Sequence, residues 1–318
     1  MGENHLRGRR DVPFSVRGMF PREDQPLVSI CMPVFNGERW LAEALDCLVN
    51  QTYRTLEILV LDNRSTDRTA AIVQRKAERD SRIRYMLDDR QRDPQAAGTR
   101  LVAMASGRYC MIACDDDHWH PEFISTLVTE LEGDPRLGMA FCNYDWIDEE
   151  GRSLVSVSIR PRPFRAEDSC LRNLLVYLEF RNPLLTFGIF RTKWLQAILP
   201  FTYPDPDCWW NADNLYFLKF LARHRIVTVE QRLFSYRRKD RTKYTPTKWR
   251  GRALRLEFFR ARHQWRVLKA FWGGVSESPL PLLQRLALLA YLPINLFNNL
   301  FTWRLYHLVR SVLCGAPI

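Results

Sequence analysis

Four short apolar runs, separated by segments with helical periodicity, constrain the fold of this chain most strongly. The runs span residues 27–32, 56–61, 83–87 and 109–113. A run this short and almost wholly apolar is typical of a strand buried on both faces of a parallel sheet. Strands that alternate with helices at this spacing form right-handed βαβ units. The sequence therefore predicts an α/β fold with a mainly parallel central sheet flanked by helices.

Acidic residues follow two of these predicted strands. One polar cluster spans residues 62–67, and the other contains Asp115, Asp116 and Asp117. Ligands of parallel α/β sheets bind beyond the carboxyl ends of the strands. Three consecutive acids after a buried strand are costly unless they are solvated, paired or bound to a cation, and carboxylate oxygens suit Mg²⁺ or Mn²⁺. A solvated turn before the helix that starts near Pro121 is the alternative interpretation.

Two further acids are candidates for chemistry. Asp62 ends the second predicted strand, where a carboxylate can accept hydrogen bonds from a base or a ribose. Taken alone, this position favours the alternative interpretation, an Asx-turn or a helix cap. Asp213 lies in an aromatic stretch before an apolar helix. An acid in such surroundings can serve as a general base, or it can simply cap the helix.

Several motifs taken together are more specific than any one acid. Residues 33–38, 45–53 and 57–69, followed by residues 107–121, resemble the nucleotide-binding half of family 2 glycosyltransferases. Residues 215–237 resemble the acceptor-side segment of that family, so the resemblance spans about residues 27–240. It implies a Rossmann-like GT-A fold, a nucleotide-sugar donor and a divalent cation, Mg²⁺ or Mn²⁺.

The resemblance also implies roles for residues around the donor. Pro33 and Asn36 would shape the loop under the nucleotide, and Asp62 would contact the base. A basic residue before the acidic triplet often faces the diphosphate in this family. Arg92 and Arg100 are both candidates for that role, and the sequence does not separate them.

The acidic triplet corresponds to the metal and diphosphate motif of the family. Asp116 and Asp117 would hold the cation, with Asp115 on the donor side. Cys114 stands where many members carry the first acid, so Asp115 and Asp117 remain an alternative D-x-D register. Asp213 matches the late catalytic acid, although the residue before it is Ala instead of the usual Glu.

These roles define an inverting mechanism. A cation held by two carboxylates stabilises the charge that develops on the departing diphosphate. Asp213 would deprotonate the acceptor hydroxyl for one in-line displacement, which needs no covalent intermediate. The rival hypothesis from another class is a noncatalytic glycan- or membrane-binding protein that keeps the fold. A nucleotidyltransferase is disfavoured, because residues 98–101 imitate its phosphate loop only inside a predicted helix.

Composition divides the chain into three parts: an N-terminal arm (1–25), a glycosyltransferase-like domain (26–240) and a helical extension (241–318). Residues 248–269 carry eight Lys or Arg and one acid, interleaved with Phe, Leu and Trp. A basic amphipathic helix of this kind can lie on an anionic membrane surface, or it can pack on the domain. Residues 279–300 are apolar but contain no clean run of about 20 apolar residues for a spanning helix.

The net charge of +11 suits a polyanionic neighbour, but no segment resembles a module that reads nucleic acid. The eight cysteines form no CxxC pair, which favours a reducing compartment. The sequence therefore predicts a cytoplasmic enzyme, peripheral on the inner face of the cell membrane, with a glycan or lipid-linked acceptor. It predicts a role in cell-surface polysaccharide synthesis.

Overall fold

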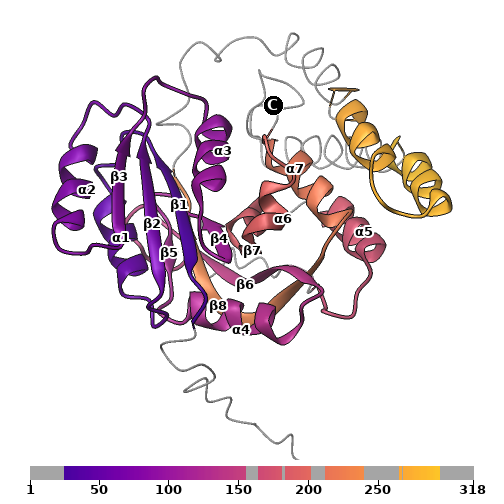
Figure 1. The fold of residues 1–318 in the computed structure, drawn as a ribbon, viewed down its shortest axis with the longest axis horizontal. Helices are drawn as coiled ribbons and strands as arrows, with labels where there is room; N and C mark the ends of the chain where they lie inside the picture. The colour runs from indigo at the N-terminus through magenta and orange to yellow at the C-terminus, as the bar shows by residue number, and fades with distance from the viewer. Residues whose placement is uncertain are drawn as a thin grey trace, which may run out of the picture.

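The computed structural model describes residues 25–154, 164–180, 183–201, 212–239, 265–266 and 268–293. The described elements build an eight-stranded sheet in the order β3-β2-β1-β4-β7-β6-β8-β5 (Figure 1). The strands are β1 (Val28–Val34), β2 (Leu56–Asp62), β3 (Ile83–Leu87), β4 (Tyr109–Ile112), β5 (His118–Trp119), β6 (Leu137–Ile147), β7 (Ile189–Arg191) and β8 (Arg225–Arg237). The helices are α1 (Leu41–Val49), α2 (Thr69–Ala77), α3 (Pro94–Met104), α4 (Phe123–Gly133), α5 (Cys170–Phe180), the 3-10 helix η3 (Pro183–Phe187), α6 (Thr192–Gln196) and α7 (Ala212–Leu221).

The first half of the sheet is the parallel one that the sequence predicts. β1 lies between β2 and β4, β3 lies outside β2, and all three pairs are parallel. The inner strands β1 and β2 are buried over nearly their whole length. Helices α1 and α2 cover one side of these strands and α3 covers the other (Figure 1). Burial on both faces explains the continuous apolar runs.

The second half of the sheet is mixed, which the apolar runs do not predict. β7 is antiparallel to both of its neighbours, β4 and β6. β8 pairs parallel to β6 with register shifts, and β5 pairs antiparallel to β8. β7 passes so close to β6 that a Cβ on Gly188 would lie 2.3 Å from Met139 Cε. Glycine at position 188 therefore permits the close approach of β7 to β6. The predicted α/β class, with helices on both faces of the sheet, is confirmed.

An aromatic layer fixes the position of β8. The ring of Phe234 packs against Trp119, Phe141 and Phe187, at centroid distances of 5.9, 6.1 and 5.5 Å. These partners lie on β5, β6 and η3, which are separated widely along the chain. Their contacts hold the end of β8 beside the loop that follows β4, where the acidic triplet lies.

The described part of the C-terminal extension is helical over residues 265–266, 268–276 and 282–293. It packs on α7, since a Cβ on Gly274 would lie 3.2 Å from Leu218 of that helix. The predicted arm up to residue 24, most of the basic tract and the chain beyond residue 293 lie outside the described residues. In the described ranges, the structure contains no helix whose length and hydropathy would suit a bilayer-spanning segment.

Candidate active site

The loops after β1 and β2 are joined to each other by hydrogen bonds. The Asn36 main-chain N–H donates to Ser65 Oγ over 2.9 Å, and the Thr66 N–H donates to Asn36 Oδ1 over 2.9 Å. Asn36 adopts a left-handed backbone with φ of 51°, which asparagine tolerates better than most residues. Pro33 lies within β1, half-buried and paired with Leu61 of β2. Pro33 and Asn36 therefore lie on one rigid platform at the carboxyl ends of these strands.

Asp62 is buried at the end of β2, and both of its carboxylate oxygens have partners. The Ser65 N–H, three residues on, donates to Oδ1 over 2.7 Å, so Asp62 stabilises the turn that follows β2. The Tyr85 hydroxyl donates to Oδ2 over 3.0 Å, and burial together with this carboxylate raises the pKa of Tyr85 to about 12. Because each carboxylate oxygen has two lone-pair positions, Asp62 keeps acceptor capacity for a ligand.

Arg92 and Arg100 converge on one buried carboxylate, Asp88. Arg92 Nε donates to both Asp88 oxygens at 3.0 and 2.9 Å, and Arg100 Nη1 donates to Oδ1 at 2.5 Å. Arg92 is also fixed by Asn63, which exchanges two hydrogen bonds of 2.7 Å with its main chain. The side chain of Arg100 is 40% exposed against 18% for Arg92. Arg100 therefore has the more accessible guanidinium.

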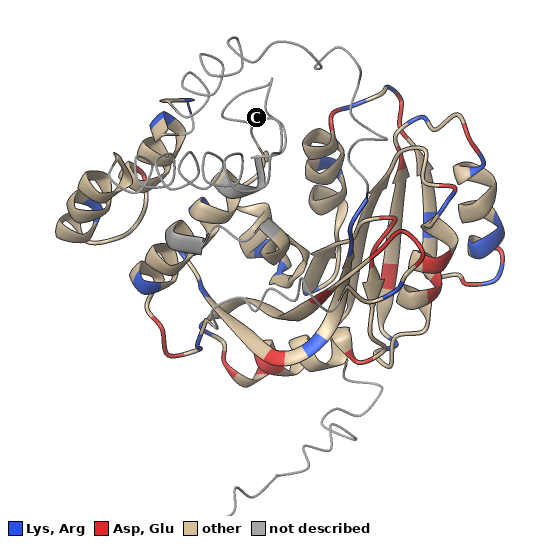
Figure 2. Ribbon diagram, turned by 180° about the vertical axis from the view of Figure 1, so that it is seen from behind, with Lys and Arg blue, Asp and Glu red and all other residues tan. Residues whose placement is uncertain are grey.

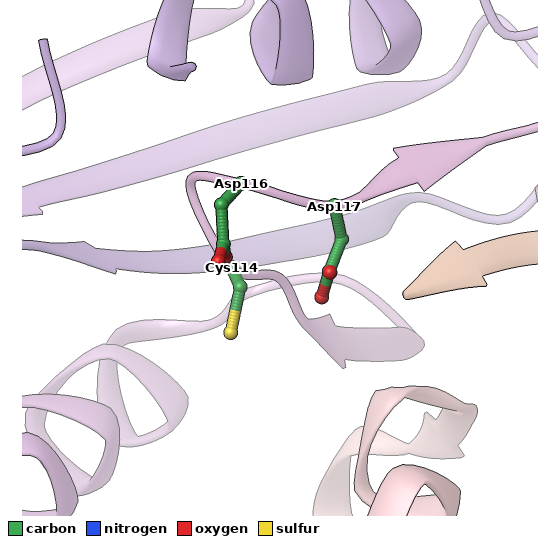
Figure 3. Close-up of side chains that lie close together, drawn as sticks. All are labelled: Cys114, Asp116 and Asp117. Atoms are coloured by element: carbon green, nitrogen blue, oxygen red, sulfur yellow. The ribbon is translucent and has the colours of Figure 1, made fainter. Parts of the chain in front are cut away.

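The residues after β4 form a cluster that suits a metal ion. Cys114 Sγ and one carboxylate oxygen each from Asp116 and Asp117 lie within 4.8 Å of one another (Figure 3). Asp117 is completely buried, and its Oδ2 has no hydrogen-bond partner among the described residues. Burial and the neighbouring Asp116 carboxylate raise the pKa of Asp117 well above its usual range. An unpartnered buried carboxylate oxygen next to a second carboxylate fits Mg²⁺ or Mn²⁺.

Asp115 is directed to a different neighbour. A Cβ on Gly37 would lie only 2.2 Å from Asp115 Oδ2, so this carboxylate packs directly over the loop after β1. Burial and the Asp116 charge raise the pKa of Asp115 to about 6. Asp115 thus links the acidic loop (residues 114–117) to the platform that carries Asn36. Because Asp115 packs against Gly37, the ligand atoms that lie close together are those of Cys114, Asp116 and Asp117.

Arg237 at the end of β8 holds the acidic loop in place, and the sequence analysis did not single it out. Its main-chain N–H donates to Asp117 Oδ1 over 2.9 Å, and its Nε donates to the Asp116 carbonyl over 2.7 Å. The rest of the guanidinium reaches Glu43 Oε2 at 3.0 Å and the Glu149 carbonyl at 2.9 Å. The side chain is 1% exposed.

Lys239 is the second residue that the sequence did not assign to the site. Its Nζ lies 2.7 Å from Asp116 Oδ2 and 5.0 Å from the centre of the Trp40 ring. Burial lowers the pKa of Lys239, but the charge and hydrogen bond of Asp116, together with the nearby Asp115 and Cys114, outweigh burial and leave the pKa above its usual value. The composition placed Lys239 at the start of the basic tract. Lys239 comes two residues after β8, and the end of β8 lies beside the acidic loop. That position in the sequence is the signal that could have identified Lys239 as a site residue.

The sequence predicts Asp213 just before an apolar helix, but α7 begins at Ala212, so Asp213 lies in the first turn of that helix. Its side chain lies outside the part of the chain that the structure describes. The structure therefore brings together the loops after β1, β2 and β4, while the role of Asp213 stays a prediction.

Comparisons with known proteins agree with this geometry. The family model for glycosyl transferase family 2 matches residues 29–192, which is just over half of the chain. The uncharacterized glycosyltransferase MJ1057 of Methanocaldococcus jannaschii is 24% identical over 256 residues, covering 79% of this chain and 84% of that protein. Several other curated relatives are matched over less than two thirds of their own length.

Solved structures with the same fold include two complexes with nucleotide sugars. Residues 1–349 of Staphylococcus aureus TarS, in complex with UDP-GlcNAc, align with a TM-score of 0.64 and 16% identity, over 86% of this chain and 73% of that one. The mannosyltransferase PcManGT of Pyrobaculum calidifontis, in complex with GDP-Man and Mn²⁺, aligns with a TM-score of 0.54 and 17% identity, over 86% and 71% of the two chains.

The fold and the family match define a glycosyltransferase of the GT-A type. The chain belongs to glycosyl transferase family 2. The resemblance of its motifs is thereby confirmed, and the noncatalytic alternative is set aside in favour of an enzyme.

Proposed function

We propose that this enzyme transfers a sugar from a nucleotide-sugar donor to a hydroxyl of a glycan or lipid-linked acceptor, with inversion and with Mg²⁺ or Mn²⁺. A role in cell-surface polysaccharide synthesis follows from that acceptor class. The observation that carries the proposal is the unpartnered Oδ2 of buried Asp117 beside Asp116, at the carboxyl end of β4. Solved structures of the same fold hold UDP-GlcNAc in one case and GDP-Man with Mn²⁺ in another.

Each group of residues has a task in this reaction. Pro33, Asn36 and Asp62 form the platform for the nucleoside, with Asp62 accepting from the base or ribose. Arg92 and Arg100 both pair with Asp88, and the more exposed guanidinium of Arg100 would meet the phosphates of a bound donor. Asp115 supports the platform through Gly37.

Asp116 and Asp117 would hold the cation, which when bound supplies positive charge to the leaving diphosphate. Asp213, at the start of α7, would take the proton from the acceptor hydroxyl. The acceptor oxygen then attacks the anomeric carbon from the side opposite the departing diphosphate. One displacement inverts the configuration, so no residue has to form a covalent glycosyl intermediate.

A titration of nucleoside diphosphate tests the donor and cation sites. Calorimetry with UDP and with GDP, each with and without Mn²⁺, should show that Mn²⁺ tightens binding of one nucleotide by about tenfold or more. Asp117→Asn should remove this gain because it removes a ligand oxygen. Asp134→Asn is the matched control, since that acid pairs with Arg136 at the end of α4. Equal binding with and without Mn²⁺ would reject the cation site.

We further propose three functional parts, with the arm at 1–25, the catalytic domain at 26–240 and the extension at 241–318 lying on the inner face of the cell membrane. The support is a group of exposed leucines, with Leu282 62%, Leu283 80% and Leu286 53% exposed on the helix at 282–293. Charged positions are few on the described C-terminal helices (Figure 2). Exposed apolar groups of this kind are stabilised by insertion among lipid headgroups.

Vesicle sedimentation tests the membrane proposal. Full-length protein should bind vesicles that contain anionic lipid, and replacement of Leu282, Leu283 and Leu286 by Ser should weaken that binding. Leu175→Ser is the matched control, because Leu175 is also exposed but lies on α5. Unchanged binding of the triple variant would contradict the proposal.

A further inference from the structure

Lys239 occupies a position that a divalent cation would also require. Its ammonium lies 2.7 Å from Asp116 Oδ2, and Asp116 belongs to the group that converges with Cys114 and Asp117. The ammonium also lies over the Trp40 ring, whose centre is 5.0 Å away. A lysine held between a carboxylate and an aromatic face is a fixed positive charge beside the acidic loop.

Arg237, the other cationic residue at this loop, does not pair with the Asp116 carboxylate. Arg237 meets Asp117 through its main-chain N–H and meets Asp116 at the carbonyl. Its guanidinium charge is directed to Glu43, at 3.0 Å. Lys239 therefore provides a side-chain cation to the Asp116 carboxylate, while Arg237 sets the path of the backbone.

A divalent ion and this ammonium would oppose each other. Mg²⁺ and related ions bind carboxylate oxygens at about 2.0–2.1 Å, so an ion on Asp116 and Asp117 would lie a few ångströms from Nζ. At such separations in a partly buried site, repulsion between like charges is substantial. The ion pair with Asp116 must loosen before the ion can use both carboxylates.

We propose that Lys239 is a built-in counter-cation that competes with the divalent ion for Asp116 and so makes metal binding depend on the donor. This inference rests on the proposed function. A nucleoside diphosphate brings new negative charge to the loop, which gives the ammonium a second partner and frees Asp116 for the ion. Metal and donor then bind cooperatively, because each lowers the free-energy cost of placing the other.

Mn²⁺ titration of the full chain without nucleotide, followed by electron paramagnetic resonance, tests the competition. Lys239→Met should bind Mn²⁺ about tenfold or more tighter than the wild type, since it removes the competing charge. Lys239→Arg keeps the charge and should stay close to wild type. Arg238→Met is the matched control, because the neighbouring Arg238 guanidinium lies over Trp146, 5.7 Å from its ring centre. Lys239→Gln repeats the test if the Met variant fails to fold.

A second titration in the presence of UDP or GDP measures the coupling. The nucleotide should increase Mn²⁺ affinity more in the wild type than in Lys239→Met. Equal Mn²⁺ affinity of wild type and Lys239→Met, with binding still lost in Asp117→Asn, would overturn the role of Lys239 and leave the cation site standing. Absence of Mn²⁺ binding from every variant, with and without nucleotide, would overturn both.

Discussion

The two halves of the sheet contribute to the site in different ways. In the parallel half, β1, β2 and β4 end at one edge, and the loops that follow them meet because parallel strands share that edge. In the mixed half, β8 reaches the same place only through its aromatic packing and its pairing with β6 and β5. The donor-side loops are thus neighbours by topology, while Arg237 and Lys239 are neighbours of the acidic loop only by tertiary contact. The candidate active site therefore lies where the parallel half meets the mixed half.

The largest expected effect separates the roles of the two halves. Asp213→Asn on α7 should reduce turnover by about 10²–10⁴-fold, the usual range for loss of a general base. Binding of the nucleoside diphosphate should be unchanged, because the proposed donor platform (Pro33, Asn36 and Asp62) belongs to the parallel half. Steady-state turnover and calorimetric titration of the same protein check this. Asp62→Asn should show the reverse, with weakened donor binding, and near-normal turnover of Asp213→Asn would reject the assignment.

Removal of the Arg237 contacts that join the two halves should mainly reduce the free energy of unfolding. Arg237→Met removes the side-chain donor of the Asp116 and Glu149 carbonyls and of Glu43, whose half-exposed carboxylate keeps His118 at 2.7 Å. Each buried acceptor that is left without a partner costs about 1–3 kcal/mol. Chemical denaturation measures the free energy of unfolding. Arg238→Met changes the adjacent exposed residue and should cost little. A small loss in Arg237→Met would mean that the halves are joined by other contacts.

Acid should destabilise the mixed half through His224, just before β8. Its ring stacks on Trp194 at 4.4 Å, and burial together with Arg223 lowers its pKa from 6.5 to about 4. The unfolded chain binds a proton below pH 6.5, whereas the folded chain resists it until about pH 4. Stability should therefore fall as pH decreases through this window, by about 2 kcal/mol after allowing for partial exposure.

His224→Phe keeps the stacked ring and removes the proton site, so it should flatten this part of the pH dependence. Denaturant unfolding at several pH values compares the variant with the wild type. An unchanged slope between pH 4 and 6.5 in the variant would show that another group causes the acid sensitivity.

The smallest expected effect comes from a change at Gly37, which tests the packing of Asp115 against the loop after β1. Gly37→Ala places a methyl group 2.2 Å from Asp115 Oδ2 and 2.8 Å from Val34 Cγ2, so the loop or the carboxylate must move. We expect nucleoside diphosphate affinity to fall by about tenfold and stability by about 1–2 kcal/mol, the range for overpacking. Gly133→Ala is the matched control, because nothing lies within 4 Å of its Cβ position. Equal affinities in both variants would show that Asp115 does not support the platform.

The parallel half and its acids could be predicted because their signals are local. Apolar runs identified β1, β2 and β4, and the rule for the carboxyl ends of strands placed Asp62 and the acidic triplet at one edge. The sequence could not separate Arg92 from Arg100, because their difference lies in how each meets Asp88. The mixed pairing of β7 was also missed, since a short apolar strand has the same pattern in either direction.

The sequence by itself determined the family, the α/β class and the residue types that gather at the strand ends, because each depends on short-range order along the chain. Tertiary structure decided that Asp117 has a buried oxygen without a partner and that Lys239 pairs with Asp116. Both facts depend on contacts between segments more than a hundred residues apart along the chain. The physical reason is that burial and Coulomb energy depend on distance in space, which local sequence does not encode.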